Sequence, residues 1–125
     1  MTGGEVFRQA MRLLGYTDTR GELDGAAHSE HYKRALSFLN QLVCELSLAE
    51  TGNVPPKLVS LGEAIPLSER AVCDVLPCGL SMMLAAAEGD GEQQALYAAL
   101  YNQKRVALRT SYERRTDALP RGCDV

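Results

Sequence analysis

The sequence predicts an all-α protein: a four-helix, bundle-like fold with a kinked third helix and a loop or short extended segment at about residues 55–67. Apolar residues recur at spacings of three and four along most of the chain, which is the period of one helix face. Glycine and proline clusters separate these periodic stretches. The 125 residues are one domain's worth of sequence. We therefore expect a single helical domain over 1–125, with a flexible C-terminal tail from about residue 117.

The first helix is predicted over 4–14. Thr2 and Glu5 have the spacing of a capping box at its start. Gly15 follows directly and suits the position after a helix C-terminus. One face carries the apolar residues Val6, Phe7, Ala10, Met11 and Leu14.

The second helix is predicted over 29–50, and it ends before Gly52 because Pro55 and Pro56 cannot continue a helix. Its apolar stripe comprises Tyr32, Leu36, Leu39, Val43 and Leu46. Residues 57–67 follow as a mixed segment with no obvious partner strand in this chain. We expect a covering loop there, unless another subunit supplies a sheet edge for one weak strand.

The third helix is predicted over 68–87, with Ser68 as its N-cap. Its stripe is formed by Val72, Val75, Leu76, Leu80, Met83 and Leu84. Pro77 lies inside it. Because proline has no N–H to donate to the carbonyl of Cys73, and its ring crowds that turn, we expect a kink or break.

The fourth helix is predicted over 91–116, capped by Asp90 with Gln93 three residues on. Two adjacent apolar tracks run along it: one holds Leu96, Leu100 and Ala107, and the other holds Tyr97, Tyr101, Leu108 and Tyr112. One track is enough to close a four-helix core. We expect the core to comprise Leu39, Val43, Leu46, Val72, Leu76, Leu80, Leu84, Leu96 and Leu100, which leaves the tyrosine track for another subunit.

Charge is distributed unevenly along the chain. The net charge is −3, divided into −6 over residues 1–103 and +3 over residues 104–125. A basic end on an acidic body is typical of a segment that meets an acidic partner. The alternative is a solvated helix end, where cations are favoured by the macrodipole. The candidate interface residues are Tyr97, Tyr101, Arg105, Leu108, Arg109, Tyr112, Arg114 and Arg115.

No motif for phosphate, dinucleotide, nucleophilic or metalloprotease chemistry occurs in the sequence. The four cysteines have no C-x-x-C spacing, and we expect Cys44 and Cys73 to be small buried hydrophobic residues. His28 and His31 lack a third ligand placed by sequence. We expect no catalytic, cofactor-binding or metal-binding residue, and no enzyme. No apolar run reaches the roughly 18 residues of a membrane helix, so no membrane contact is expected.

Five stretches carry a resemblance to a known family. They are Arg12-Leu13-Leu14-Gly15; Ala35-Leu36-Ser37-Phe38-Leu39-Asn40-Gln41-Leu42; the segment 59–67, close to Leu-x-Leu-Gly-Glu-x-Ile-Pro-Leu but beginning with Val59; residues 75–85; and residues 99–105. The strongest pieces are Leu-Pro-x-Gly-Leu at 76–80 and Tyr-Asn-Gln-Lys-Arg at 101–105. Over roughly residues 4–116 the chain resembles the small helical head–tail connector proteins of tailed bacteriophages, also called neck or adaptor proteins and often encoded in prophages. Cys78 departs from the pattern, which has an aromatic residue there.

The resemblance implies a structural virion protein. Such subunits form a ring, commonly twelve-fold, below the portal protein; the ring extends the DNA channel and docks tail or stopper proteins. Packaged DNA would pass through without sequence-specific binding. The location implied is the host cytoplasm during assembly and then the virion neck. The alternative is a small helical regulatory or nucleic-acid-binding adaptor, although the net acidic charge argues against an ordinary duplex-DNA binder.

Overall fold

The computed structural model describes residues 1–16 and 29–118, and the side chains of this range up to residue 109. It contains the helices α1 (Gly3–Leu13), α2 (Ser29–Thr51), η1 (Ala71–Val75, a π-helical turn), α3 (Leu76–Glu88) and α4 (Gly91–Ala118). Over the described residues there is no β-strand, only an isolated bridge between Thr2 and Ala64. The predicted all-α, four-helix fold is confirmed.

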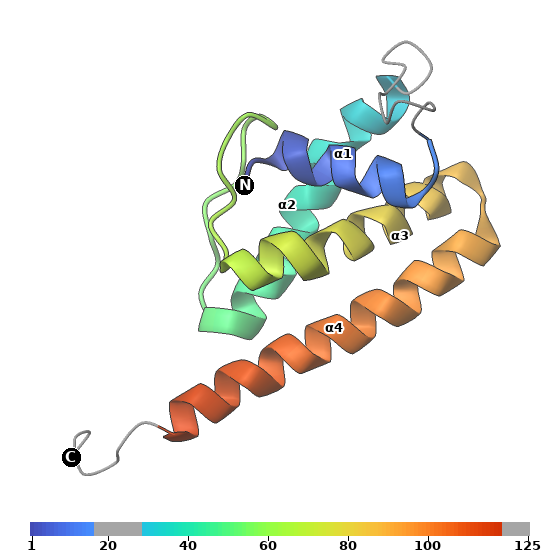
Figure 1. Cartoon of the computed structure of the whole chain (residues 1–125). Coiled ribbons are helices and arrows are strands. Elements are labelled where there is room, and N and C mark those ends of the chain that lie inside the picture. The colour runs from blue at the N-terminus through green and yellow to red at the C-terminus, as the bar shows by residue number, and fades with distance from the viewer. Residues whose placement is uncertain (17–28, 119–125) are drawn as a thin grey trace.

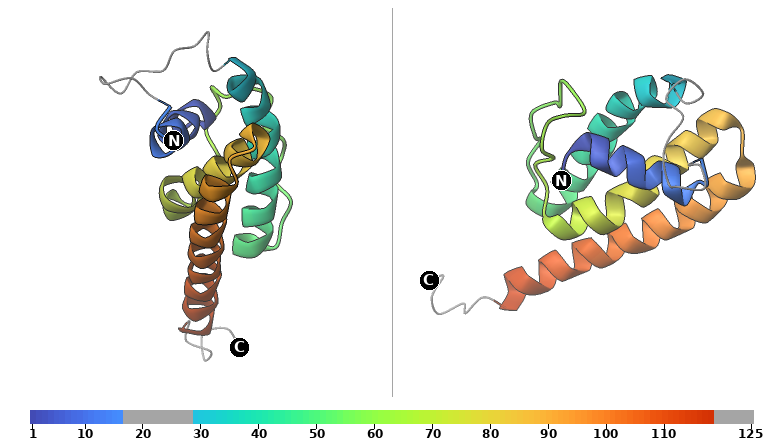
Figure 2. Two further views of the ribbon diagram at one scale, coloured as in Figure 1. Left: turned by 90° about the vertical axis from the view of Figure 1, so that its right-hand side faces the viewer. Right: turned by 45° about the horizontal axis from the view of Figure 1, so that its top comes forward.

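Helix α3 lies at the centre of the fold and packs against each of the other helices (Figure 1). Helices α1 and α2 lie on opposite sides of it, with η1 on the α1 side (Figure 2, left). Helix α4 packs most extensively on α3 and then extends past the other helices. Its 28 residues correspond to a length of about 42 Å.

The ends of α1 follow from local sequence signals. The amide of Glu5 donates to Oγ1 of Thr2 at 3.3 Å, and the amide of Thr2 donates to Oε1 of Glu5 at 3.3 Å. Gly15 has a φ of 78°, which lets the amide of Tyr16 donate to the carbonyl of Met11 at 2.9 Å. These hydrogen bonds satisfy backbone groups that a helix end leaves unpaired. The predicted capping box and C-terminal glycine are both confirmed.

The expected break at Pro77 takes the form of the π-helical turn η1. Ser68 caps this segment, since its Oγ accepts from the amide of Ala71 at 3.2 Å. The amide of Leu76 then donates to the carbonyl of Ala71, five residues back instead of four. This wider turn accommodates a proline that cannot donate to Cys73, and α3 begins with Pro77 in its first turn.

Residues 53–68 form a loop that covers the end of the bundle. The amide of Gly4 donates to the carbonyl of Leu61 at 2.7 Å, and the amide of Ile65 donates to the carbonyl of Met1 at 3.1 Å. Three apolar residues of the loop itself are buried: Leu58, Leu61 and Ile65. The expected covering loop is therefore found, with no partner strand among the described residues. Residues 1–4 hold it through backbone hydrogen bonds and one isolated bridge.

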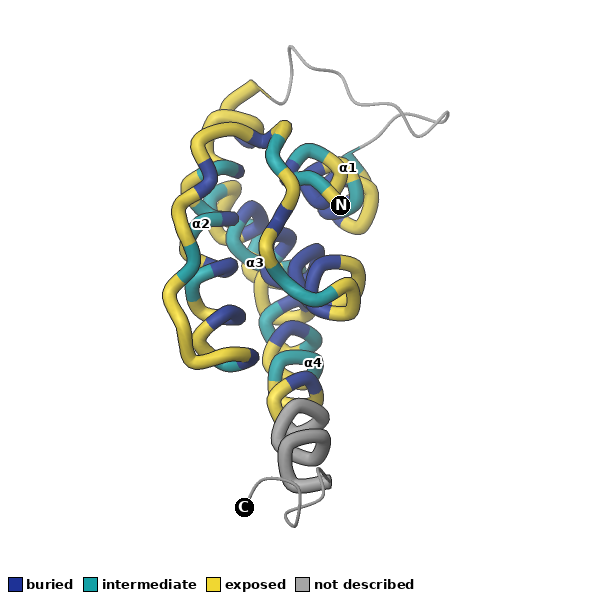
Figure 3. Tube along the Cα trace, turned by 90° about the vertical axis from the view of Figure 1, so that its left-hand side faces the viewer, coloured by how far each residue is buried: buried dark blue, intermediate teal, exposed yellow. Residues whose placement is uncertain are grey.

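Most of the predicted core is buried (Figure 3). Seven of the nine predicted residues are at most 3% exposed: Leu39, Val43, Leu46, Val72, Leu76, Leu80 and Leu84. One prediction is wrong, because Leu96 is 54% exposed, and Leu100 is half-buried and packs against the edge of the core. Tyr32 is also exposed and contacts Phe7 edge-on. Of the cysteines, Cys78 is buried, Cys44 is half-buried and Cys73 is exposed, which corrects the expectation for the last two.

One segment is long and apolar enough to cross a membrane by length and composition, contrary to the sequence-based expectation. It is Ala71–Glu88, with a mean hydropathy of 1.4. In this structure 61% of it is buried among the other helices. A central helix surrounded by three others is apolar on nearly all sides, so its composition is explained by its place in the core.

Candidate functional site

Three of the eight candidate interface residues face the protein's own core. Tyr97 is 8% exposed, Tyr101 is 3% exposed and Leu108 is 1% exposed. The described residues of the tyrosine track therefore lie in the core, whereas Leu96 and Ala107 of the leucine track are exposed and Leu100 is half-buried. This reverses the predicted assignment of the two tracks and removes these three residues from the candidate surface.

The reason lies in α3, where Gly79 faces the ring of Tyr101. A Cβ at position 79 would lie 2.8 Å from Cε1 and 2.9 Å from Cδ1 of that ring. Only glycine lets the ring approach the helix backbone this closely. Burial, reinforced by the Glu45 carboxylate, raises the pKa of Tyr101 well above its usual value. Two of the motifs that carry the resemblance, Leu-Pro-x-Gly-Leu at 76–80 and Tyr-Asn-Gln-Lys-Arg at 101–105, thus meet in one packing contact between α3 and α4.

The polar end of Tyr97 is satisfied inside the bundle. Its hydroxyl donates to the carbonyl of Leu13 at 2.7 Å, near the C-terminal end of α1. A buried phenol needs such a partner, because an unpaired hydroxyl would lose its hydrogen bonds to water. This bond ties the first half of α4 to α1.

Two cations of α4 are bound within the protein. Lys104 forms an ion pair with Asp74 of η1, and this hydrogen bond raises the pKa of Lys104. Arg105 lies 3.4 Å from Glu45 of α2, and its guanidinium carbon is 5.9 Å from the centre of the Tyr101 ring. Arg105, one of the candidate interface residues, is therefore half-buried and forms an ion pair within its own chain.

The remaining candidates lie further along α4. Arg109 is exposed, one turn beyond Arg105. The side chains of Tyr112, Arg114 and Arg115 lie outside the described ones. The backbone of α4 is helical through this region, to Ala118. A basic partner-binding end therefore stays a prediction, now restricted to Arg109 and the residues that follow it.

A surface that the sequence analysis missed runs along the outer side of α4. Between Glu92 and Lys104 the helix carries no charged residue. The exposed side chains of this uncharged face are Ala95, Leu96, Ala99, Gln103, Val106 and Ala107. A solvated helix normally carries charges on its outer side. The absence of charged residues between Glu92 and Lys104 was the sequence signal that could have revealed this surface. Such depletion of charge is typical of the centre of an interface.

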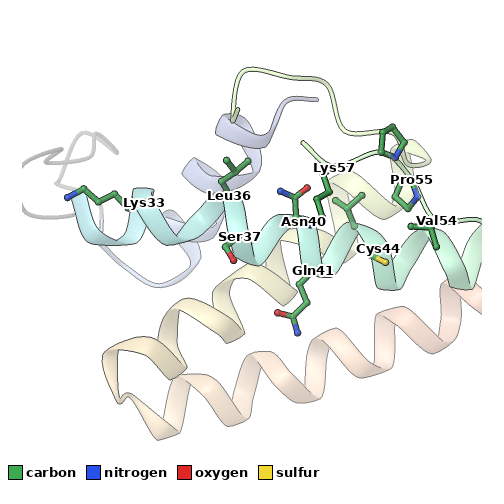
Figure 4. Close-up of a pocket in the computed structure, with 11 residues that line it drawn as sticks. Lys33, Leu36, Ser37, Asn40, Gln41, Cys44, Val54, Pro55 and Lys57 are labelled. Carbon is green, nitrogen blue, oxygen red and sulfur yellow. The ribbon is translucent and has the colours of Figure 1, made fainter. Parts of the chain in front are cut away.

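A second surface lies along α2 on the other flank of the molecule. It is an open groove of about 670 Å³ between α2 and the loop at 54–57 (Figure 4). Lys33 lies at one end, and Ser37, Gln41 and Cys44 follow along the helix. Asn40 holds the loop in place, because its side chain accepts from the amide of Leu58 at 2.7 Å and donates to the Leu58 carbonyl at 3.0 Å.

His31, singled out in the sequence, is used structurally. It is buried, its Nε2 lies 2.5 Å from the Glu88 carboxylate, and its ring stacks on Tyr16 at 5.3 Å. His28 lies outside the described residues. Within the part of the chain that the structure describes, no three potential ligands cluster to hold a metal ion.

Comparison with known proteins adds no relative: no family model, no curated protein and no solved structure matches this chain.

Proposed function

We propose that this chain is a head–tail connector subunit of a tailed bacteriophage, which assembles into a ring below the portal protein. The ring would extend the DNA channel and present a platform to tail or stopper proteins. This proposal combines the motif resemblance with the helical architecture. It assigns the protein a structural role, first in the host cytoplasm and then in the virion neck.

One observation supports the proposal: residues of the resemblance anchor the middle of α4 on the body. Gly79 receives the Tyr101 ring, and Lys104 and Arg105 bind Asp74 and Glu45. These contacts involve the middle of α4, so the helix is fixed on both sides while its last turns extend past the bundle. A rigid arm with a basic end suits a subunit that docks onto an acidic surface of a larger assembly.

The test is a pull-down on the cognate portal protein. Wild type is compared with the Arg114→Glu, Arg115→Glu double variant, and with a chain truncated after Leu108. The matched control is Arg8→Glu, Arg34→Glu, which changes the net charge equally at exposed sites on α1 and α2.

We expect the wild type and the control to bind, and the two α4 variants to lose most of their binding. Binding should also weaken as salt rises, because exposed charges are screened. Circular dichroism checks that each variant folds. Folded α4 variants that bind as tightly as wild type would show that the basic end has no part in docking. Absence of portal binding by the wild type would contradict the connector function itself.

A further inference from the structure

The uncharged face of α4 and the groove on α2 lie on opposite flanks of the molecule. Lys104 contacts η1 and Arg105 contacts α2, so these two neighbours define the two sides of α4. Leu100 and Ala107 are four residues before and three residues after Lys104, which places them on its side of the helix. The leucine track thus looks away from α2. Figure 2 (left) shows η1 and α2 on opposite sides of the body.

We propose that the uncharged face of α4 from one copy packs into the α2 groove of the next copy. This inference names the subunit interface of the proposed connector ring, and its choice of a second copy as occupant rests on that function. A contact between two different faces of the same chain is heterologous, so it propagates from copy to copy and closes into a ring when the rotation allows.

The two surfaces match in length. The groove residues Lys33 and Cys44 are eleven positions apart on α2. Glu92, the last charge before the uncharged face, and Gln103 are also eleven positions apart on α4. Each span is about 16 Å of helix. A helix laid in a groove uses residues spaced by three, four and seven, and α4 offers Leu96, Ala99 and Gln103 at these spacings.

The two surfaces also match in charge. Lys33 lies at one end of the groove, and its ion pair with Glu30 is exposed and long, at 3.5 Å. Such a pair contributes little and leaves the lysine available. Glu92 is exposed at the start of α4. Aligned in parallel, the two helices pair Glu92 with Lys33 and bring Gln103 beside Cys44. Between these ends the α2 residues that line the groove are uncharged, and the one further charge in the lining is the exposed Lys57 of the loop.

Cross-linking tests both the interface and its direction. In a chain carrying Cys73→Ser, Cys78→Ala and Cys123→Ser, Cys44 is kept and Gln103→Cys is added. A short bismaleimide is then applied to the concentrated protein. Each link uses Cys44 of one copy and residue 103 of the next, so the products should form a ladder of dimers, trimers and larger species. The linker traps even a weak association.

The matched control moves the added cysteine to the other end of the face, as Glu92→Cys. That site lies about 16 Å from position 103 along α4, so its ladder should be much weaker. Three results would overturn the proposed packing. The Gln103→Cys chain could give no ladder, it could give dimers only, or the Glu92→Cys chain could give an equally strong ladder. Retention of the ladder after Cys44→Ser would do the same.

Charge reversal supplies an independent measurement. In the cross-linking chain, Glu92→Lys should reduce the ladder by up to about five-fold, the worth of one exposed ion pair, and Lys33→Glu should restore it. A reduction without restoration would contradict the pairing. The portal pull-down separates this inference from the function: portal binding without a ladder rejects only the interface, whereas a ladder without portal binding rejects only the connector role.

Discussion

Replacing Gly79 with alanine probes the contact on which the position of α4 depends. The new methyl group would lie 2.8 Å from Cε1 of Tyr101, 2.9 Å from Cδ1 of Tyr101 and 3.1 Å from Cδ2 of Leu42. The tyrosine ring is rigid and buried, so relief requires α4 to move or the ring to turn. Overpacking of this kind costs roughly 1–3 kcal/mol, whereas alanine in a helix gains about 1 kcal/mol over glycine.

We therefore expect Gly79→Ala to lower the free energy of unfolding by about 1 kcal/mol. At a helical site with no obstructing side chain, the same substitution would raise it by about 1 kcal/mol. Urea denaturation followed by circular dichroism measures this. Gly91→Ala is the control, because a Cβ built there has no described neighbour within 4 Å apart from the adjacent residues and the helix's own backbone. It should be neutral or stabilising.

A double-mutant cycle assigns the cost to Tyr101. Tyr101→Ala alone should cost about 3–5 kcal/mol, the usual loss for a buried aromatic residue. Without the ring, adding Gly79→Ala should no longer destabilise, which gives a coupling free energy of about 1–2 kcal/mol. If Gly79→Ala stabilises the wild-type chain, the ring does not pack on this glycine and the account of the α3–α4 contact is refuted.

Three further predictions concern stability. Leu39→Ala and Leu80→Ala should each cost about 2–5 kcal/mol in urea denaturation, whereas Leu96→Ala should change stability by no more than about 0.5 kcal/mol; equal losses would contradict the assignment of the α4 faces. Glu50→Ala removes the acceptor of the Ser68 amide and hydroxyl and should cost about 1–3 kcal/mol by the same assay, with exposed Glu69→Ala as the control. The pKa of Tyr101 is raised in the folded state, so above the ordinary pKa near 10 the unfolded chain loses this proton more readily than the folded chain. The contribution of Tyr101 to stability is therefore complete below about pH 10 and is lost as the pH rises further. Thermal unfolding at pH 8 and above 10 should show a smaller loss in Tyr101→Phe than in wild type, and identical losses would exclude Tyr101 as the cause.

The helix ends were predictable because their signals are local. Thr2 and Glu5 cap α1, Ser68 caps the segment before α3, and Asp90 accepts from the amide of Gln93 at 3.1 Å. Each contact involves residues three apart, so the sequence contains everything needed to form it. Hydrogen bonds from the side chain and the backbone amide of Gln93 also lower the pKa of Asp90, which keeps this cap ionised.

The orientation of α4 was not predictable in the same way. Both of its tracks are apolar, and periodicity alone does not choose between Leu96 and Tyr97. The choice is made by Gly79, which lies 22 positions before Tyr101 and provides space for that ring. The candidate interface failed at Tyr97, Tyr101 and Leu108 for this reason. The absence of charged residues between Glu92 and Lys104 was a better guide to the exposed apolar face of α4 than the two apolar tracks were.

Two other features depend on contacts that are distant in the sequence. The loop before Ser68 is paired with residues 1–4, which no pattern within the loop indicates. Pro77 predicted a break in the third helix, but not that a π-helical turn would absorb it. In both cases the local sequence shows that ordinary helix hydrogen bonding is interrupted, and only the tertiary structure shows where the freed backbone groups find partners.

Electron microscopy of the portal ring mixed with this protein tests the connector function most directly. The account predicts one added layer of protein on the tail-side face of the portal, coaxial with its channel and with matching rotational symmetry. The same sample with the Arg114→Glu, Arg115→Glu variant should show bare portal rings. Portal rings that stay bare with saturating wild-type protein would contradict the proposed function.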